Sequence, residues 1–230
     1  VIGAGLHVLI EKPLAMTLGE ARTILDASRA RPDRLAMVSQ NFRWRPHTLA
    51  LRQAVRDGLI GRPGHMSIEC RQPIRRKTVD AWREAMAEPL LMDFGIHHFD
   101  LMRYLTGQEP REVVGTSFRP AWSWFKGNTA AAAVVTMEDG LVVNYNATMV
   151  AQGSDTPQEG IITIAGEQGT LQLDERSQIR LFGEGEPRTI PPVPVPEGEL
   201  GHALAEFVDA IRARRLPETH VADNIRSLAL

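Results

Sequence analysis

Val8-Leu9-Ile10-Glu11-Lys12-Pro13-Leu14-Ala15 is the stretch of sequence that decides the fold. Its apolar run from Val8 to Ile10 predicts a buried parallel strand, and Pro13 ends that strand because proline has no N–H for the ladder. Glu11 and Lys12 would then lie at the carboxyl end of a sheet, which is where open α/β folds bind ligands. An ammonium group there can donate to a ligand hydroxyl or a developing oxyanion. A surface pair of Lys12 with Glu11 is the alternative explanation.

The next segments continue a β-α-β-α rhythm. Thr17 and Glu20 fit a capping box that opens a helix, and residues 35–39 predict the next strand. Pro46 suits the first turn of the following helix and Gly58 its end. This rhythm indicates the last part of a doubly wound parallel sheet.

After about Arg62 the pattern changes to short strands around one prominent helix. Glu138-Asp139-Gly140 and Glu167-Gln168-Gly169 are turn signals that indicate hairpins. We therefore expect a mixed fold, α/β over residues 1–62 and α+β with a predominantly antiparallel sheet over residues 63–230. The expected elements of the second part are strands at 65–71, 111–118, 130–137, 141–148, 160–165, 170–173 and 178–182, a helix within 89–106, and an amphipathic helix over 201–215 with Leu204, Phe207, Val208 and Ile211 inward.

The composition excludes several classes of function. A hydrophobic content of 43% with 23% charged residues is ordinary for a globular protein, and the net charge of −2 gives no electrostatic reason to expect nucleic acid or an anionic membrane as a partner. The apolar stretches are too short to span a bilayer. The single Cys70 excludes an intrachain disulfide and suits a reducing cytoplasm. No Cys/His grouping has zinc-ligand spacing, so we expect no metal.

The central helix carries the residues that suggest chemistry. On an α-helical wheel Asp93, His97, Asp100 and Tyr104 share one side of an otherwise apolar helix. Burying such groups costs several kcal/mol unless they are paired or face a wet cleft. His97 is a natural general base near neutral pH, and Asp93 could accept one of its ring N–H groups. Alternatively Asp93 is only an N-cap, His97 a core residue, or the pair half of a metal site.

Two motifs resemble those of one enzyme family. "HVLIEKPLA" and "MDFGIHHFDLMRYLTG" are similar to the Glu-Lys-Pro and Asp-x-x-x-His signatures of the glucose-fructose oxidoreductase / inositol dehydrogenase / rhizopine-catabolism (Gfo/Idh/MocA) family. The resemblance implies a Rossmann domain followed by a sheet domain whose central helix lines the active site. It also implies an NAD(P)-dependent oxidoreductase of sugars or polyols. The stretch from Gly3 to Val8 lacks the third glycine of a dinucleotide fingerprint. The resemblance implies that the Glu-Lys-Pro signature follows the fifth Rossmann strand, so we expect the earlier strands to lie upstream of Val1, and residues 1–230 alone to bind cofactor weakly and be inactive.

The resemblance assigns roles to individual residues. Lys12, Asp93 and His97 match the catalytic positions, with His97 the expected general acid/base, and they should converge on one cleft. Whether the cofactor is NAD or NADP is left open, because the residue that reads the ribose would lie upstream. The other matching residues are Glu11, Lys12, Pro13 and Asn41 for the cofactor, and Arg43, Trp82, Arg83 and His98 for the substrate.

The same resemblance leaves two alternative functions open and implies a homo-oligomer. The chain could belong to a non-catalytic cofactor-binding regulator, or to a glycosidase-like member that uses NAD transiently. Strand 141–148 alternates two sets of side chains, neither strongly charged. Since one face of an antiparallel sheet is often open, we expect a homodimer or homotetramer through this sheet.

Overall fold

The computed structural model describes residues 1–75 and 81–230, and the chain divides into two compact units. One unit comprises Val1–Arg45 and Pro194–Leu230, and the other comprises Pro46–Val193. This division differs from the expected boundary after residue 62. The C-terminal segment packs with the first unit, and the helix that begins at Pro46 packs with the second.

The first unit contains a parallel pair of strands, β1 (Val8–Glu11) and β2 (Ala36–Ser39). The predicted capping box opens α1 (Leu18–Arg29): the backbone N–H of Glu20 donates to Oγ1 of Thr17 at 3.2 Å, and the N–H of Thr17 donates to Oε2 of Glu20 at 3.1 Å. β2 is fully buried, whereas β1 is only half-buried, so the expectation that β1 is a buried strand is too strong. β2 is hydrogen-bonded on both edges. β1 pairs with one edge, and on the other the carbonyl oxygen of Thr219 accepts the N–H of Val38 at 2.9 Å.

The C-terminal helices complete this unit. α5 (Gly198–Ala213) packs on the short 3₁₀ helix η2 (Asn41–Trp44), and α6 (Val221–Ala229) packs on α1 and β2. Leu204, predicted to face inward, is 52% exposed, while Phe207 on the same helix is buried. The main apolar cluster is made of Ile2, which belongs to the 3₁₀ helix η1 (Ile2–Ala4), and of Leu14, Ala21, Leu25, Ala36, Val38 and Val221.

The second unit is built on an eight-stranded sheet of order β10-β9-β8-β7-β3-β6-β5-β4. Neighbouring strands are antiparallel except β3 and β6, which pair in parallel, so the predicted predominantly antiparallel sheet is confirmed. Both predicted hairpins form, and the short β10 was not predicted. The strands are β3 (Pro63–Arg71), β4 (Pro110–Phe118), β5 (Ala130–Met137), β6 (Val142–Thr148), β7 (Ile161–Gly166), β8 (Gly169–Leu173), β9 (Ile179–Phe182) and β10 (Arg188–Ile190).

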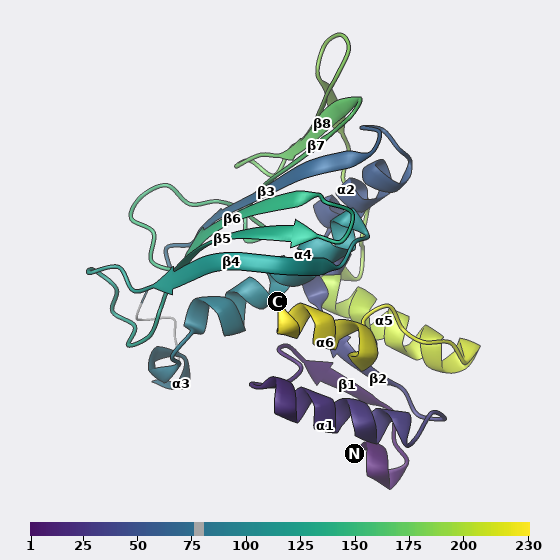
Figure 1. Ribbon diagram of the computed structural model, residues 1–230. Coiled ribbons are helices and arrows are strands. Elements are labelled where there is room, and N and C mark those ends of the chain that lie inside the picture. The colour runs from purple at the N-terminus through teal and green to yellow at the C-terminus, as the bar shows by residue number, and fades with distance from the viewer. Residues whose placement is uncertain (76–80) are drawn as a thin grey trace. The chain divides into compact units, whose positions relative to one another are not determined.

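Helices α2 (Pro46–Arg56) and α4 (Ile96–Thr106) lie on one face of this sheet and pack on each other (Figure 1). The alternation of β6 shows the two faces: Val143 and Tyr145 are buried, and Asn144 between them is exposed. Through the strand register Asn144 lies opposite Val134 of β5, which lies opposite Val114 of β4. All three are exposed and uncharged, so the middle of β4 to β6 presents an open row of uncharged side chains.

The predicted helix within residues 89–106 forms in two parts. Leu90–Gly95 (η4) is wound as a π-helix, and α4 follows at Ile96. Gly95 lies at the junction, where an added Cβ would come within 3.1 Å of the carbonyl oxygen of Leu90 and 3.3 Å of the hydroxyl of Tyr145. The absence of a side chain therefore lets this turn approach β6 closely.

Candidate functional site

Asp93 lies in η4 and forms an ion pair that the sequence did not reveal. Nε of Arg83 is 3.0 Å from Oδ2 of Asp93, and the carboxylate side chain is only 14% exposed. The guanidinium of Arg83 also lies over the ring of Trp82, 4.8 Å from its centroid. Trp82 and Arg83 belong to the short helix α3 (Ala81–Ala85). Three of the predicted site residues therefore lie together in the second unit.

The N-cap explanation for Asp93 does not hold. Pro89 is the N-cap of η4, and Asp93 lies within this helix. Since a π-helix has a wider turn than an α-helix, the α-helical wheel that placed Asp93 and His97 on one side does not describe this segment. Single π-turns occur often at functional sites, which fits the position of Asp93.

His97 lies in the first turn of α4 and is 4% exposed. An imidazole at this depth is reached by a substrate only where side chains leave an opening to it. Its assignment as general acid/base stays a prediction.

His98 is fully buried and bridges α4 to the sheet. Its Nε2 is 2.8 Å from the carbonyl oxygen of Gln158, and its Nδ1 is 3.1 Å from the hydroxyl of Tyr145. A carbonyl oxygen only accepts, so Nε2 carries a proton and donates to Gln158. Burial raises the pKa of Tyr145 well above its ordinary value, which keeps the phenol protonated. The neutral tautomer that satisfies both bonds accepts the tyrosine proton at Nδ1. Both ring nitrogens are thus used within the protein, which favours a packing role over the expected substrate contact.

Asp100, the third acidic or basic group on the predicted helix face, belongs to a buried charge network. Nη1 of Arg103 is 3.8 Å from its Oδ1, and Nε of Arg103 is 2.7 Å from Oε2 of Glu109. The side chains of Asp100 and Arg103 are 1% and 3% exposed. The charge of Asp100 is thus balanced within the protein, so the sequence argument that a buried charge implies chemistry fails for Asp100.

In the first unit, the Glu-Lys-Pro motif lies at the end of β1, as predicted. Glu11 is the last residue of β1 and is exposed, Lys12 is half-buried, and the Lys12–Pro13 peptide bond is cis. Lys12 and Pro13 therefore lie at the carboxyl end of a parallel strand.

The residues after β2 are held by α5 and α6. Nδ2 of Asn41 donates to Oε1 of Glu199 at 3.0 Å. Arg43 is 5% exposed, and its Nη2 donates to Oδ2 of Asp223 at 2.9 Å. The guanidinium of Arg43 thus ties η2 to α6, an internal role from which no substrate contact follows.

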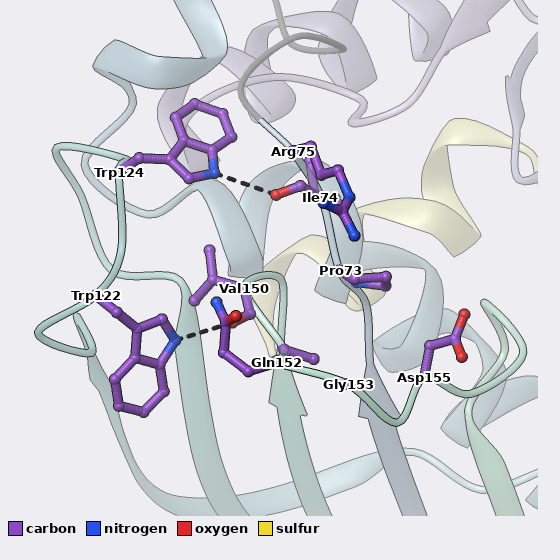
Figure 2. Close-up of a pocket in the computed structure, with 10 residues that line it drawn as sticks. Pro73, Ile74, Arg75, Trp122, Trp124, Val150, Gln152, Gly153 and Asp155 are labelled. Carbon is purple, nitrogen blue, oxygen red and sulfur yellow. Dashed lines mark hydrogen bonds between the residues drawn. The ribbon is translucent and has the colours of Figure 1, made fainter.

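The second unit also contains a cavity of about 600 Å³ that the sequence analysis did not anticipate. It lies where the chain leaves β3 and β6, next to the loop between β4 and β5 (Figure 2). Its signal in the sequence is the pair of tryptophans in Trp122-Ser123-Trp124, within the loop that joins β4 to β5. Its lining residues are Pro73, Ile74, Arg75, Trp122, Trp124, Val150, Ala151, Gln152, Gly153 and Asp155.

Comparison with known proteins identifies the family. Residues 48–172 match the model of the GFO/IDH/MocA C-terminal domain, which is more than half of the chain. The chain belongs to the GFO/IDH/MocA family. The matched segment falls entirely within the second compact unit, so this unit contains the family's C-terminal domain.

Relatives from this family cover different parts of the chain. D-apiose dehydrogenase of Paraburkholderia graminis is 26% identical over 99% of this chain, which spans 63% of that enzyme. The rhizopine catabolism protein MocA of Rhizobium meliloti is 36% identical over 52% of this chain, which here covers 35% of that protein. The crystal structure of an oxidoreductase from Agrobacterium radiobacter in complex with NAD+, L-tartaric acid and magnesium has a TM-score of 0.89 at 21% identity. It covers all of this chain, which in turn covers 70% of that structure's chain, and it confirms the predicted fold.

No helix within residues 1–75 and 81–230 is both long and apolar enough to cross a membrane.

Proposed function

We propose that the protein containing this chain is an NAD(P)-dependent oxidoreductase that acts on a CH–OH group of a sugar, a polyol or a related hydroxy compound. The observation that carries the proposal is the presence of both signatures in a chain of this family: Lys12 at the carboxyl end of β1, and Asp93 and His97 in the η4–α4 helix. The relatives named as dehydrogenases and reductases of sugars and inositol support the substrate class.

The residues around Lys12 fit a nicotinamide cofactor. Dinucleotides bind beyond the carboxyl ends of parallel strands, and β1 and β2 pair in parallel and end together at Glu11 and Ser39. Glu11, Lys12, Pro13 and Asn41, which follow these two strands, are the residues that would hold the cofactor. When bound, the nicotinamide would accept or deliver a hydride at the carbon that carries the substrate oxygen. NAD is the cofactor named with the structural neighbour from Agrobacterium radiobacter.

The protein's own groups would handle the proton. We assign to an imidazole nitrogen of His97 the removal of the hydroxyl proton, and to the Lys12 ammonium the donation of a hydrogen bond to an oxygen of the cofactor or the substrate. Asp93 shares its negative charge with Arg83, so a carboxylate and a guanidinium together would set the electrostatic environment of the hydroxyl groups. Trp82, which is 56% exposed beside Arg83, supplies an apolar face for a sugar ring.

Two matched pairs of variants test this assignment in the whole protein. A screen of sugars and polyols first identifies a substrate. The reaction is monitored by the absorbance of the reduced nicotinamide at about 340 nm. His97→Ala and Lys12→Ala should then each lower kcat by roughly 10²-fold or more, the usual contribution of a general acid–base group. His65→Ala and Lys126→Ala alter exposed residues of the same two types and should leave kcat unchanged.

The outcomes separate this function from its alternatives. A protein that binds NAD(P) but oxidises no member of the screen would fit the regulator. A net hydrolysis product without accumulation of reduced cofactor would fit the glycosidase-like member. Near-normal kcat in His97→Ala would refute the role of His97.

We also propose that the protein forms a homodimer or homotetramer through the open face of β4 to β6. Val114 and Val134 on this face are 68% and 46% exposed, and both lie in one row with Asn144. Adjacent exposed valines are unfavourable in water and are typical of surfaces that a second subunit covers.

A further inference from the structure

The cavity of the second unit is lined by two tryptophans whose ring orientation is fixed. Nε1 of Trp122 donates to the carbonyl oxygen of Val150 at 2.9 Å, and Nε1 of Trp124 donates to the carbonyl oxygen of Ile74 at 3.1 Å. Figure 2 shows both bonds, which run from the loop to the chain beyond β6 and beyond β3. Since both indole N–H groups are already used, the rings can offer a ligand only their faces and outer edges.

The loop that carries these rings is itself held by side-chain bonds. Arg119 donates from Nε to the carbonyl oxygen of Phe125 at 2.7 Å and from Nη2 to that of Ser123 at 2.8 Å. The ring of Trp124 stacks on that of Phe125, with centroids 3.8 Å apart. Phe125 is fully buried and anchors the loop in the core. The aromatic wall therefore exists before any ligand arrives, which lowers the entropy that a ligand must overcome.

Polar groups complete the lining. Arg75, Gln152 and Asp155 are exposed and line the same cavity, and Figure 2 shows Arg75 and Asp155 on the side away from the two tryptophans. A guanidinium, an amide and a carboxylate together provide both hydrogen-bond donors and acceptors. Among the lining residues that the structure describes, one positive and one negative charge give no net preference for an anion. The lining fits a neutral ligand rich in hydroxyl groups.

We propose that this cavity is a carbohydrate-binding site, in which a neutral pyranose stacks its C–H face on Trp122 and bonds through its hydroxyls to Asp155 and Gln152. Trp122 is 61% exposed, so a large apolar ring is held in a fixed orientation at the surface. The cavity volume of about 600 Å³ lies within the roughly 300–1,000 Å³ usual for small-molecule sites, and it has room for more than one sugar ring. All of its lining residues belong to the C-terminal domain, and binding there requires no cofactor.

Sugar binding to the protein, measured by calorimetry and saturation-transfer NMR without nicotinamide, tests the proposal. The probes are the methyl pyranosides of glucose, galactose and mannose, with maltose and cellobiose as two-ring ligands. Trp122→Ala should weaken binding of the best probe about tenfold, as expected when roughly 60 Å² of indole is no longer covered. Asp155→Asn, which keeps the shape of the side chain, should weaken it less. Phe118→Ala removes another exposed aromatic ring, outside the cavity, and should leave binding unchanged.

Two results would overturn the proposal: no probe binding more tightly than about 10 mM, or unchanged binding in both Trp122→Ala and Asp155→Asn. Circular dichroism of each variant shows whether it is folded, and Asp155→Asn still tests the site if Trp122→Ala does not fold. Because no cofactor or turnover is involved, a failure here leaves the proposed dehydrogenase activity standing, and an inactive protein leaves this site standing.

Discussion

Tyr145→Phe isolates the bond between β6 and α4. The substitution keeps the ring, which packs against Phe99 with centroids 5.4 Å apart, and removes only the hydroxyl. That hydroxyl is 3.1 Å from Nδ1 of His98, and neither residue is more than 3% exposed. Nδ1 would lose its donor in a place that water does not reach.

The expected cost follows from this burial. A buried polar group left without its partner costs about 1–3 kcal/mol. For a chain of this length each kcal/mol lowers the melting temperature by roughly 2–4 °C. Tyr104→Phe is the matched control, because Tyr104 is half-buried and water can replace what its hydroxyl loses; we expect a change within about 0.5 kcal/mol.

Urea unfolding followed by circular dichroism measures both variants. A double-mutant cycle with His98→Leu then assigns the loss to the pair, since residues in contact show coupling of about 0.5–3 kcal/mol. If Tyr145→Phe costs no more than Tyr104→Phe, or if the cycle shows no coupling, the tautomer and the bridge derived for His98 are wrong.

Three further predictions concern pH, the thiol and assembly. The side chain of His220 caps α6, because its Nδ1 accepts the backbone N–H of Ala222. Burial lowers the pKa of this imidazole below 6.5, although the charge of Asp223 opposes the shift. The contribution of His220 to stability should therefore be full above about pH 6.5 and fall as the pH drops toward the pKa of the folded state. His220→Asn, which can cap without titrating, should show a smaller loss of unfolding free energy between about pH 7 and about pH 5.5, an interval that includes the usual histidine pKa of about 6.5. Burial raises the pKa of Cys70 to about 12, so Ellman's reagent should label the native chain at pH 8 far more slowly than the urea-unfolded chain. Val134→Glu on the open sheet face should convert the oligomer to a monomer in light scattering of the whole protein, and a wild-type monomer at micromolar concentration would refute that interface.

The sequence by itself determined the local elements of this chain and its family. The alternation of residues 141–148, the turns at Gly140 and Gly169, and the capping box at Thr17 are written in neighbouring residues, because strand period, turn geometry and helix caps are local properties. The Glu-Lys-Pro and Asp-x-x-x-His motifs likewise depend on short spacing, and they indicated the family that the comparisons confirm.

Tertiary structure decided which side chains meet. Arg83 pairs with Asp93 of another helix, and His98 finds its partners on β6 and in the following loop, from residues up to 60 positions away. A helical wheel shows only which residues share a side, and here the π-turn of η4 alters even that. Which buried charge is structural and which is free for chemistry depends on the partner brought by the rest of the fold, because the cost of burying a charge is set by that partner.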